Sequence, residues 1–168
     1  MKKYLLFLIL INIFSLSGAS LAETGNRPEK IKIAAIGDLV MHIPVKMSAE
    51  MHNIMRDGKS INNGGYNYLF AATKSVFSQH DSTIANMEFP VVYPFDSRAF
   101  NFNCKPEIIP AMLQSGINIV TIANNHTYDK GVKGLVETLE RLDNAGLKYI
   151  GAGNNEEHAR RGLILTKG

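Results

Sequence analysis

The sequence is poor in cysteine and in excess positive charge, and both absences restrict what it can be. Cys104 is the only cysteine in 168 residues, so no intramolecular disulfide can form and stability must come from packing. A lone thiol of this kind is expected to be a small buried hydrophobe. The chain has 18 Lys and Arg against 15 Asp and Glu, and two of the lysines lie in its first three residues. This near-neutral balance gives no sign of a nucleic-acid partner.

Long apolar runs are also absent, apart from one at the N-terminus. Two lysines are followed by an almost wholly apolar run over 4–16 and by small residues at Ser20 and Ala22. This pattern predicts a signal peptide over 1–22, because a membrane-spanning helix needs about 20 apolar residues. Residues 23–30, which are polar and contain Gly25 and Pro28, are then expected to form a flexible leader. We expect an exported protein of the periplasm or cell envelope, with an uncleaved signal acting as a membrane anchor as the alternative.

Hydrophobic periodicity over the rest of the chain alternates between strands and helices. Strands are predicted at 31–36, 83–87, 117–123, 147–150 and 163–166. Helices are predicted at 45–55, 68–79, 107–115, 132–145 and 156–161. The stretch 56–67 reads as a loop, and 89–105 as irregular with a short edge strand at 100–103. Such alternation predicts one α/β domain over 31–168, with helices on the faces of a sheet.

Polar residues follow three consecutive strands of this predicted sheet. Gly37-Asp38 follows the first strand, Asn86 and Glu88 lie at the end of the second, and the run 124–131 follows the third. Sites in open α/β sheets form beyond the carboxyl ends of the strands. Carboxylate, amide and imidazole groups together suit a divalent ion such as Mn, Zn, Fe or Mg.

Each of these residues also has an ordinary structural explanation. Asp38 could cap the next helix, Glu88 could be a solvated loop acid, Asn124 and Asn125 could be turn residues, His126 could be a structural histidine, and Asp129 could start a helix. The coincidence at three strand ends favours a site. The other histidines, His42, His52, His80 and His158, are expected to be structural or solvent-facing, with His42 the least certain.

At these residues the sequence resembles the CapA family of capsule and poly-γ-glutamate biosynthesis proteins, which have a calcineurin-like metallophosphatase fold. The resemblance rests on Gly37-Asp38, on Asn-x-Glu-x-Pro from Asn86, and on Asn-Asn-His-x-x-Asp-x-Gly from Asn124. It covers roughly 31–168. The fold it implies is a layered α/β sandwich, of which this chain carries the first half.

The resemblance also implies a role for each residue. Asp38, Glu88 and Asn125 match the metal ligands of the first three metallophosphatase motifs. His126 matches the histidine that stabilises charge developing on the substrate, and Asp129 would orient it. Asn86 and Asn124 are added as candidate substrate-binding residues.

The sequence departs from the wider phosphatase pattern at two positions, and it also lacks motifs of the family's second half. Val40 stands where phosphatases have a histidine ligand, and Glu88 stands where they have Asp; the CapA family shares both changes. The His-Trp-Gly-x-Glu and His-x-His motifs of the family's second half are not found after His126. We therefore expect a fragment, an interrupted gene or a shortened record, whose two-metal site lacks about half its ligands.

Three functions follow as hypotheses. The first is metal-dependent, hydrolase-like chemistry on a phosphoester or on an anionic cell-surface polymer, in or near a membrane-bound capsule synthesis complex. The second is a non-catalytic subunit that binds or guides the polymer. The third is an inactive fragment.

Overall fold

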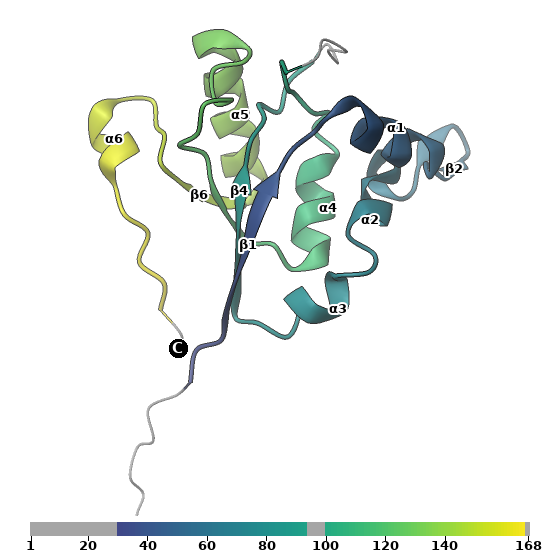
Figure 1. Cartoon of the computed structure of the whole chain (residues 1–168), viewed down its shortest axis with the longest axis horizontal. Helices are drawn as coiled ribbons and strands as arrows, with labels where there is room; N and C mark the ends of the chain where they lie inside the picture. The colour runs from purple at the N-terminus through teal and green to yellow at the C-terminus, as the bar shows by residue number, and fades with distance from the viewer. Residues whose placement is uncertain (1–29, 94–99, 167–168) are drawn as a thin grey trace, which may run out of the picture.

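The computed structural model describes residues 30–93 and 100–166, whose core is a four-stranded parallel sheet (Figure 1). The strands are β1 (Ile33–Leu39), β4 (Ser82–Met87), β5 (Ile119–Thr121) and β6 (Lys148–Ile150), in the spatial order β1-β4-β5-β6. The predicted α/β architecture is confirmed. The predicted signal peptide and nearly all of the leader lie outside the described residues.

The larger helices are α1 (Ile43–Met51), α4 (Ile108–Ser115) and α5 (Gly131–Ala145), with α6 (Glu156–Arg160) as a short C-terminal helix. Helices α4 and α5 end at Gly116 and Gly146, both in the left-handed conformation that glycine adopts without a Cβ penalty. In Figure 1, α1 and α4 lie on one side of β1 and α6 lies on the other. No helix in the described part of the chain has the length and apolar character needed to cross a membrane.

The core lies between the sheet and these helices. Ala85 and Met87 of β4, Val120 of β5 and the following Ile122 are buried with Met112 of α4 and Leu139 and Leu142 of α5. On β1, Ile33 and Ala35 are exposed whereas Ala34 and Ile36 are half-buried. One face of this edge strand is therefore open to solvent. Cys104 is fully buried, as its isolation in the sequence predicted.

Several predicted elements were wrong in detail. The predicted loop 56–67 contains parts of a hairpin, β2 (Met55–Arg56) with β3 (Lys59–Ser60), and the 3-10 helix η1 (Asn63–Gly65). The predicted helix 68–79 is two short helices, α2 (Tyr66–Leu69) and α3 (Lys74–Phe77).

Two predicted strands do not form. The segment 163–166 joins no ladder, so the fifth strand was wrong. The edge strand at 100–103 is also absent, and its neighbour Cys104 makes only an isolated parallel bridge with Val91. A strand needs a partner for its backbone groups, and alternation in sequence does not supply one.

Candidate functional site at the carboxyl ends of the strands

Asn86 lies at the centre of the polar residues that the sheet gathers. A register irregularity between Ala35 and Asp38 in β1 places Asp38 directly opposite Asn86 of β4. The side-chain amide nitrogen of Asn86 donates to Asp38 Oδ1 at 2.9 Å and to Glu88 Oε1 at 3.0 Å. One amide group therefore holds two carboxylates at the same edge of the sheet. Asp38 is exposed and Glu88 is half-buried.

The carbonyl oxygen of the same Asn86 amide faces β5. It accepts hydrogen bonds from Thr121 Oγ1 at 3.0 Å and from Asn124 Nδ2 at 3.2 Å. Two donors and two acceptor positions are all that an asparagine side chain offers, so Asn86 is fully used. Thr121 was not predicted as part of the site, although its register position opposite Asn86 follows from the pairing of β4 with β5.

Asn124 joins the strand network to the loop that carries the imidazole. Its amide nitrogen also donates to the backbone oxygen of Met87 at 3.0 Å. Its Oδ1 accepts from the backbone N–H of His126 at 3.1 Å, which is the local turn bond expected of an asparagine. Asn124 thus does what a turn residue does and also contacts Asn86.

His126 is fixed in orientation by Asp129. Its Nδ1 lies 3.0 Å from Asp129 Oδ2, and both side chains are mostly buried. The same carboxylate oxygen accepts the backbone N–H of Phe102 at 2.6 Å, and the Phe102 ring lies 4.4 Å from the His126 ring. Because Asp129 occupies Nδ1, the free nitrogen of His126 for a ligand is Nε2.

The structural alternatives for three residues do not hold. The residue at the N-cap of α1 is His42, so Asp38 does not cap that helix. Glu88 is held by Asn86 and is not a fully solvated acid. The N-cap of α5 is Lys130, so Asp129 is not its capping residue.

Asn125 and His42 lie near this network. Asn125 is exposed beside the network. His42 lies with its ring 6.0 Å from the ring of Phe102, which brings it close to the His126 side of the site.

Three other histidines have local roles or lie elsewhere. His52 stacks on Tyr68 with ring centroids 3.4 Å apart, and its Nδ1 contacts the Ser48 carbonyl at 2.7 Å. His80 contacts the carbonyl of Val76 at 2.9 Å. His158 lies on α6 and lines a separate pocket.

The carboxylate oxygens of this site are ligands that suit a divalent cation, but only two carboxylates are brought together. Asp38 and Glu88 provide two carboxylates brought together by one amide. Within residues 30–93 and 100–166, no group of three or more His, Cys, Asp or Glu side chains is placed to hold a metal ion. A hard cation such as Mg²⁺ is commonly held by one or two carboxylates and keeps several waters. These residues therefore fit part of such a coordination shell.

Comparison with known proteins gives the family. Residues 32–168 match the family described as bacterial capsule synthesis protein PGA_cap. The chain belongs to this family. Its fold is metallophosphatase-like, in agreement with the layered α/β structure.

Several similar proteins carry related names. The chain is 28% identical to the capsule biosynthesis protein CapA of Bacillus anthracis over 133 residues, which is 76% of this chain and 29% of the relative. It is 21% identical to the PGA biosynthesis protein CapA of Bacillus subtilis in an alignment that covers 95% of this chain and 41% of the relative.

A shorter match is to a probable polyglutamine synthesis accessory protein of Mycobacterium tuberculosis. The two are 33% identical over 73 residues, which is 44% of this chain and 19% of the relative. The chain thus spans less than half the length of each of these relatives.

Proposed function

We propose that this chain forms part of an exported capsule or polyglutamate biosynthesis protein, with a divalent-cation site at the carboxyl ends of β1 and β4. The observation that carries the proposal is the single Asn86 amide nitrogen that holds Asp38 at 2.9 Å and Glu88 at 3.0 Å. Two carboxylates this close repel each other unless a positive charge or a donor lies between them. The Asn86 amide is a neutral donor and offsets only part of this repulsion, and a cation bound by both carboxylates would offset the rest.

The contacts suggest a role for each residue of the site. Asp38 and Glu88 would hold the cation, with Asn125 supplying an amide oxygen and water completing the shell; Mn, Zn, Fe and Mg remain the candidate ions. Such a cation polarises an oxygen of a phosphoester or an acyl group. Asn86 would set the distance between the carboxylates, since all four of its hydrogen-bonding positions are used within the network.

His126 is the group best placed to exchange a proton with a substrate. Its Nδ1 is held by Asp129, which fixes the ring and leaves Nε2 for a hydrogen bond to charge that develops on the substrate. Asp129 is then a positioning residue. Asn124 would support the same loop through its hydrogen bonds to Asn86, Met87 and His126, and would have to give up one of these bonds to contact a substrate.

The biological setting is proposed from the family. We place the protein in the periplasm or cell envelope, at a membrane-bound capsule synthesis complex, acting on an anionic polymer or a phosphoester and not on nucleic acid. The names of the Bacillus and Mycobacterium relatives, which refer to capsule, PGA and polyglutamine synthesis, support this setting.

The test is metal binding by equilibrium dialysis with Mn²⁺ on the 168-residue chain. The double variant Asp38→Asn with Glu88→Gln should lose the bound Mn²⁺. A control of the same charge change at exposed positions, Asp57→Asn with Glu140→Gln, should keep it. Hydrolysis of a chromogenic phosphodiester by a full-length relative, with and without the corresponding Asp38 change, then tests for chemistry. Equal Mn²⁺ uptake by both double variants would contradict a cation site formed by Asp38 and Glu88.

A second candidate function is polymer binding without chemistry. The observation that favours it is the small number of ligating side chains within the described residues. Under this alternative Asp38 and Glu88 would be structural acids, and removing them would leave polymer binding and the absence of turnover unchanged.

A further inference from the structure

The hairpin of β2 and β3 carries two cations directly opposite each other. Arg56 pairs with Lys59 in the antiparallel register. The two residues of the turn between them, Asp57 and Gly58, both have positive φ, which is the geometry of a tight hairpin. Both cations are exposed, and neither forms an ion pair with any residue in the described part of the chain. Like charges opposite each other destabilise a hairpin, so an anionic partner would relieve this pair.

The same face of the hairpin carries an apolar pair behind the cations. The Ile61 N–H donates to the Ile54 carbonyl at 3.0 Å, which extends the pairing by one step beyond Met55 and Ser60. Side chains alternate between the two faces of a hairpin, so both isoleucines share a face with the two cations. Ile54 is 55% exposed and Ile61 is 50% exposed. This face therefore combines positive charge at its tip with apolar surface at its base.

The opposite face of the hairpin is turned toward the rest of the chain. The Ser60 hydroxyl donates to Asn53 Oδ1 at 2.7 Å and accepts the backbone N–H of Gly64 at 2.7 Å. Because Ser60 makes these contacts, the face with the cations and isoleucines is the one directed to solvent.

Exposed apolar side chains are concentrated around this hairpin. Six large apolar side chains of the segment 47–68 are at least half exposed: Met47, Met51, Ile54, Met55, Ile61 and Tyr68. Helices α1 and α2 and the turn η1 contact one another, and β3 contacts η1. Figure 1 shows α1, α2 and β2 grouped together beyond the end of β1 that carries Asp38. Clustered apolar exposure of this kind marks an interaction surface.

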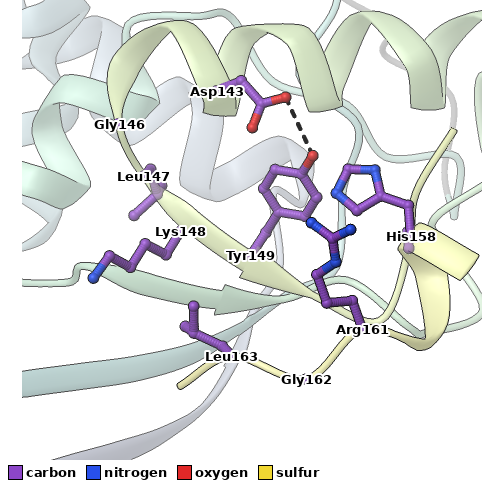
Figure 2. Close-up of a pocket in the computed structure, with 10 residues that line it drawn as sticks. Asp143, Gly146, Leu147, Lys148, Tyr149, His158, Arg161, Gly162 and Leu163 are labelled. Carbon is purple, nitrogen blue, oxygen red and sulfur yellow. Dashed lines mark hydrogen bonds between the residues drawn. The ribbon is translucent and has the colours of Figure 1, made fainter. Parts of the chain in front are cut away.

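A pocket elsewhere in the molecule is also lined by several cations but arranges them differently. It lies between the end of α5, strand β6 and the segment after α6, and its volume is about 260 Å³. Figure 2 shows that its Lys148 points away from Arg161 and His158. These side chains therefore do not form one anion site, whereas the register of the hairpin places Arg56 and Lys59 together.

We propose that the hairpin of β2 and β3 docks on an anionic lipid surface through Arg56 and Lys59 and the two isoleucines behind them. Each cation near an anionic membrane strengthens attachment about fivefold, and apolar side chains enter the boundary between headgroups and acyl chains. A soluble polyanion would offer the cations the same charge but no apolar region for the isoleucines, which favours lipid. The inference rests on the proposed function for its setting in the cell envelope. Docking would hold the carboxyl end of β1 near the membrane.

The test uses tryptophan fluorescence, because the chain contains no tryptophan. Ile61→Trp places one reporter on the proposed face, and Val132→Trp, at an exposed position of α5, is the matched control. Vesicles of phosphatidylglycerol and phosphatidylcholine in EDTA should shift the emission of Ile61→Trp to the blue, and brominated acyl chains should quench it. The emission of Val132→Trp should change little. Equal changes at both positions would overturn the docking surface.

A charge arm separates the hairpin cations from net charge. In the Ile61→Trp background, Arg56→Gln with Lys59→Gln should lose most of the shift, as should vesicles of phosphatidylcholine alone. Lys133→Gln with Lys148→Gln carries the same charge change on α5 and β6 and should keep the shift. Equal loss in both double variants would reduce the effect to net charge and contradict the proposal. Thermal unfolding of each variant shows that a lost shift is not a lost fold.

Two further outcomes would contradict lipid docking by the hairpin. Vesicles that bind the chain only through another segment, such as the apolar run 4–16, would leave the emission of Ile61→Trp unchanged. A soluble γ-linked glutamate polymer that alters the emission as much as vesicles do, and prevents the vesicle response, would identify a polymer site. Because EDTA removes any divalent cation, failure of vesicle docking would leave Mn²⁺ uptake intact, and failure of the cation site would leave docking intact.

Discussion

The amide side and the imidazole side of the candidate site are built in different ways. On the amide side, Asn86 sits within a strand and makes four side-chain hydrogen bonds to three neighbouring segments. On the imidazole side, His126 lies on a loop and is oriented by one carboxylate, Asp129, which also holds the backbone of Phe102. The first side is fixed by the sheet, and the second depends on one residue that joins two loops. A substitution on the amide side should therefore perturb several segments of the fold, whereas a substitution on the imidazole side should perturb only the loops that Asp129 contacts.

The largest effect is expected from Asn86→Ala. It removes four hydrogen bonds and leaves two carboxylates without their shared donor, so we expect a loss of about 2–4 kcal/mol in the free energy of unfolding. Chemical denaturation measures this loss. Asn67→Ala, which removes the bond to Gln114 and the one from Asn63, is the control and should cost less. A smaller loss for Asn86→Ala than for the control would show that the amide side is not fixed by Asn86.

Gly151→Ala should have the next largest effect, a loss of about 1–3 kcal/mol in the free energy of unfolding. Gly151 has a φ of +93°, and a Cβ there would lie 2.7 Å from the Cβ of Ala123, just before the site loop. Gly146→Ala is the matched control, because Gly146 has a φ of +72° with nothing within 4 Å of a new Cβ. The difference between the two variants in thermal unfolding isolates the steric contact. Equal destabilisation would mean that the site loop does not pack on Gly151.

Asp129→Ala should lower the free energy of unfolding by about 1–2 kcal/mol and perturb only the loops around His126 and Phe102. It removes the acceptor of both His126 Nδ1 and the Phe102 N–H. Nitrogen chemical shifts of His126 should show that the tautomer protonated at Nδ1 loses population, while the amide resonances of Asn86 stay in place. Movement of Asn86 as large as that of His126 would break the distinction between the two sides.

The smallest effect near neutral pH concerns Cys104, two residues beyond Phe102. Burial raises the pKa of the Cys104 thiol from 9.0 to about 12, because the thiolate would be desolvated. The thiol therefore stays protonated in the folded protein while the unfolded chain begins to ionise near pH 9. The stability that this group contributes should be constant below pH 9 and fall between pH 9 and 12. Cys104→Ala should remove part of that fall; an unchanged pH profile, or rapid alkylation of native protein at pH 7.5, would contradict it.

Helices and strands were predicted correctly from the sequence where the local hydrophobic pattern is strong and, for strands, where a neighbouring strand is available for pairing. Helix α5 and strand β6 were predicted closely, because their periodicity is strong and Gly146 separates them. The hairpin of β2 and β3 was missed although Asp57 and Gly58, both with positive φ, form the two-residue turn typical of hairpins. The segment 163–166 was predicted as a strand from composition, but no neighbouring strand pairs with it.

For the site, the sequence indicated which residues gather but not how they bond. Asp38, Glu88 and Asn124 meet at Asn86 because parallel strands end together, and His126 follows on the same loop as Asn124. The irregular register in β1, which brings Asp38 opposite Asn86, has no sequence signal beyond Gly37. The role of Asn86 as the shared donor therefore required the structure, as did the contact of Asp129 with Phe102.

The most direct test of the cation site is its location. Mn²⁺ added in substoichiometric amounts to the isotope-labelled 168-residue chain should broaden the side-chain amide signals of Asn86 and Asn124 and the ring signals of His126. The hairpin signals of Met55 to Ser60 should remain sharp. Absence of broadening at Asn86, or equal broadening at the hairpin, would contradict a cation bound between Asp38 and Glu88.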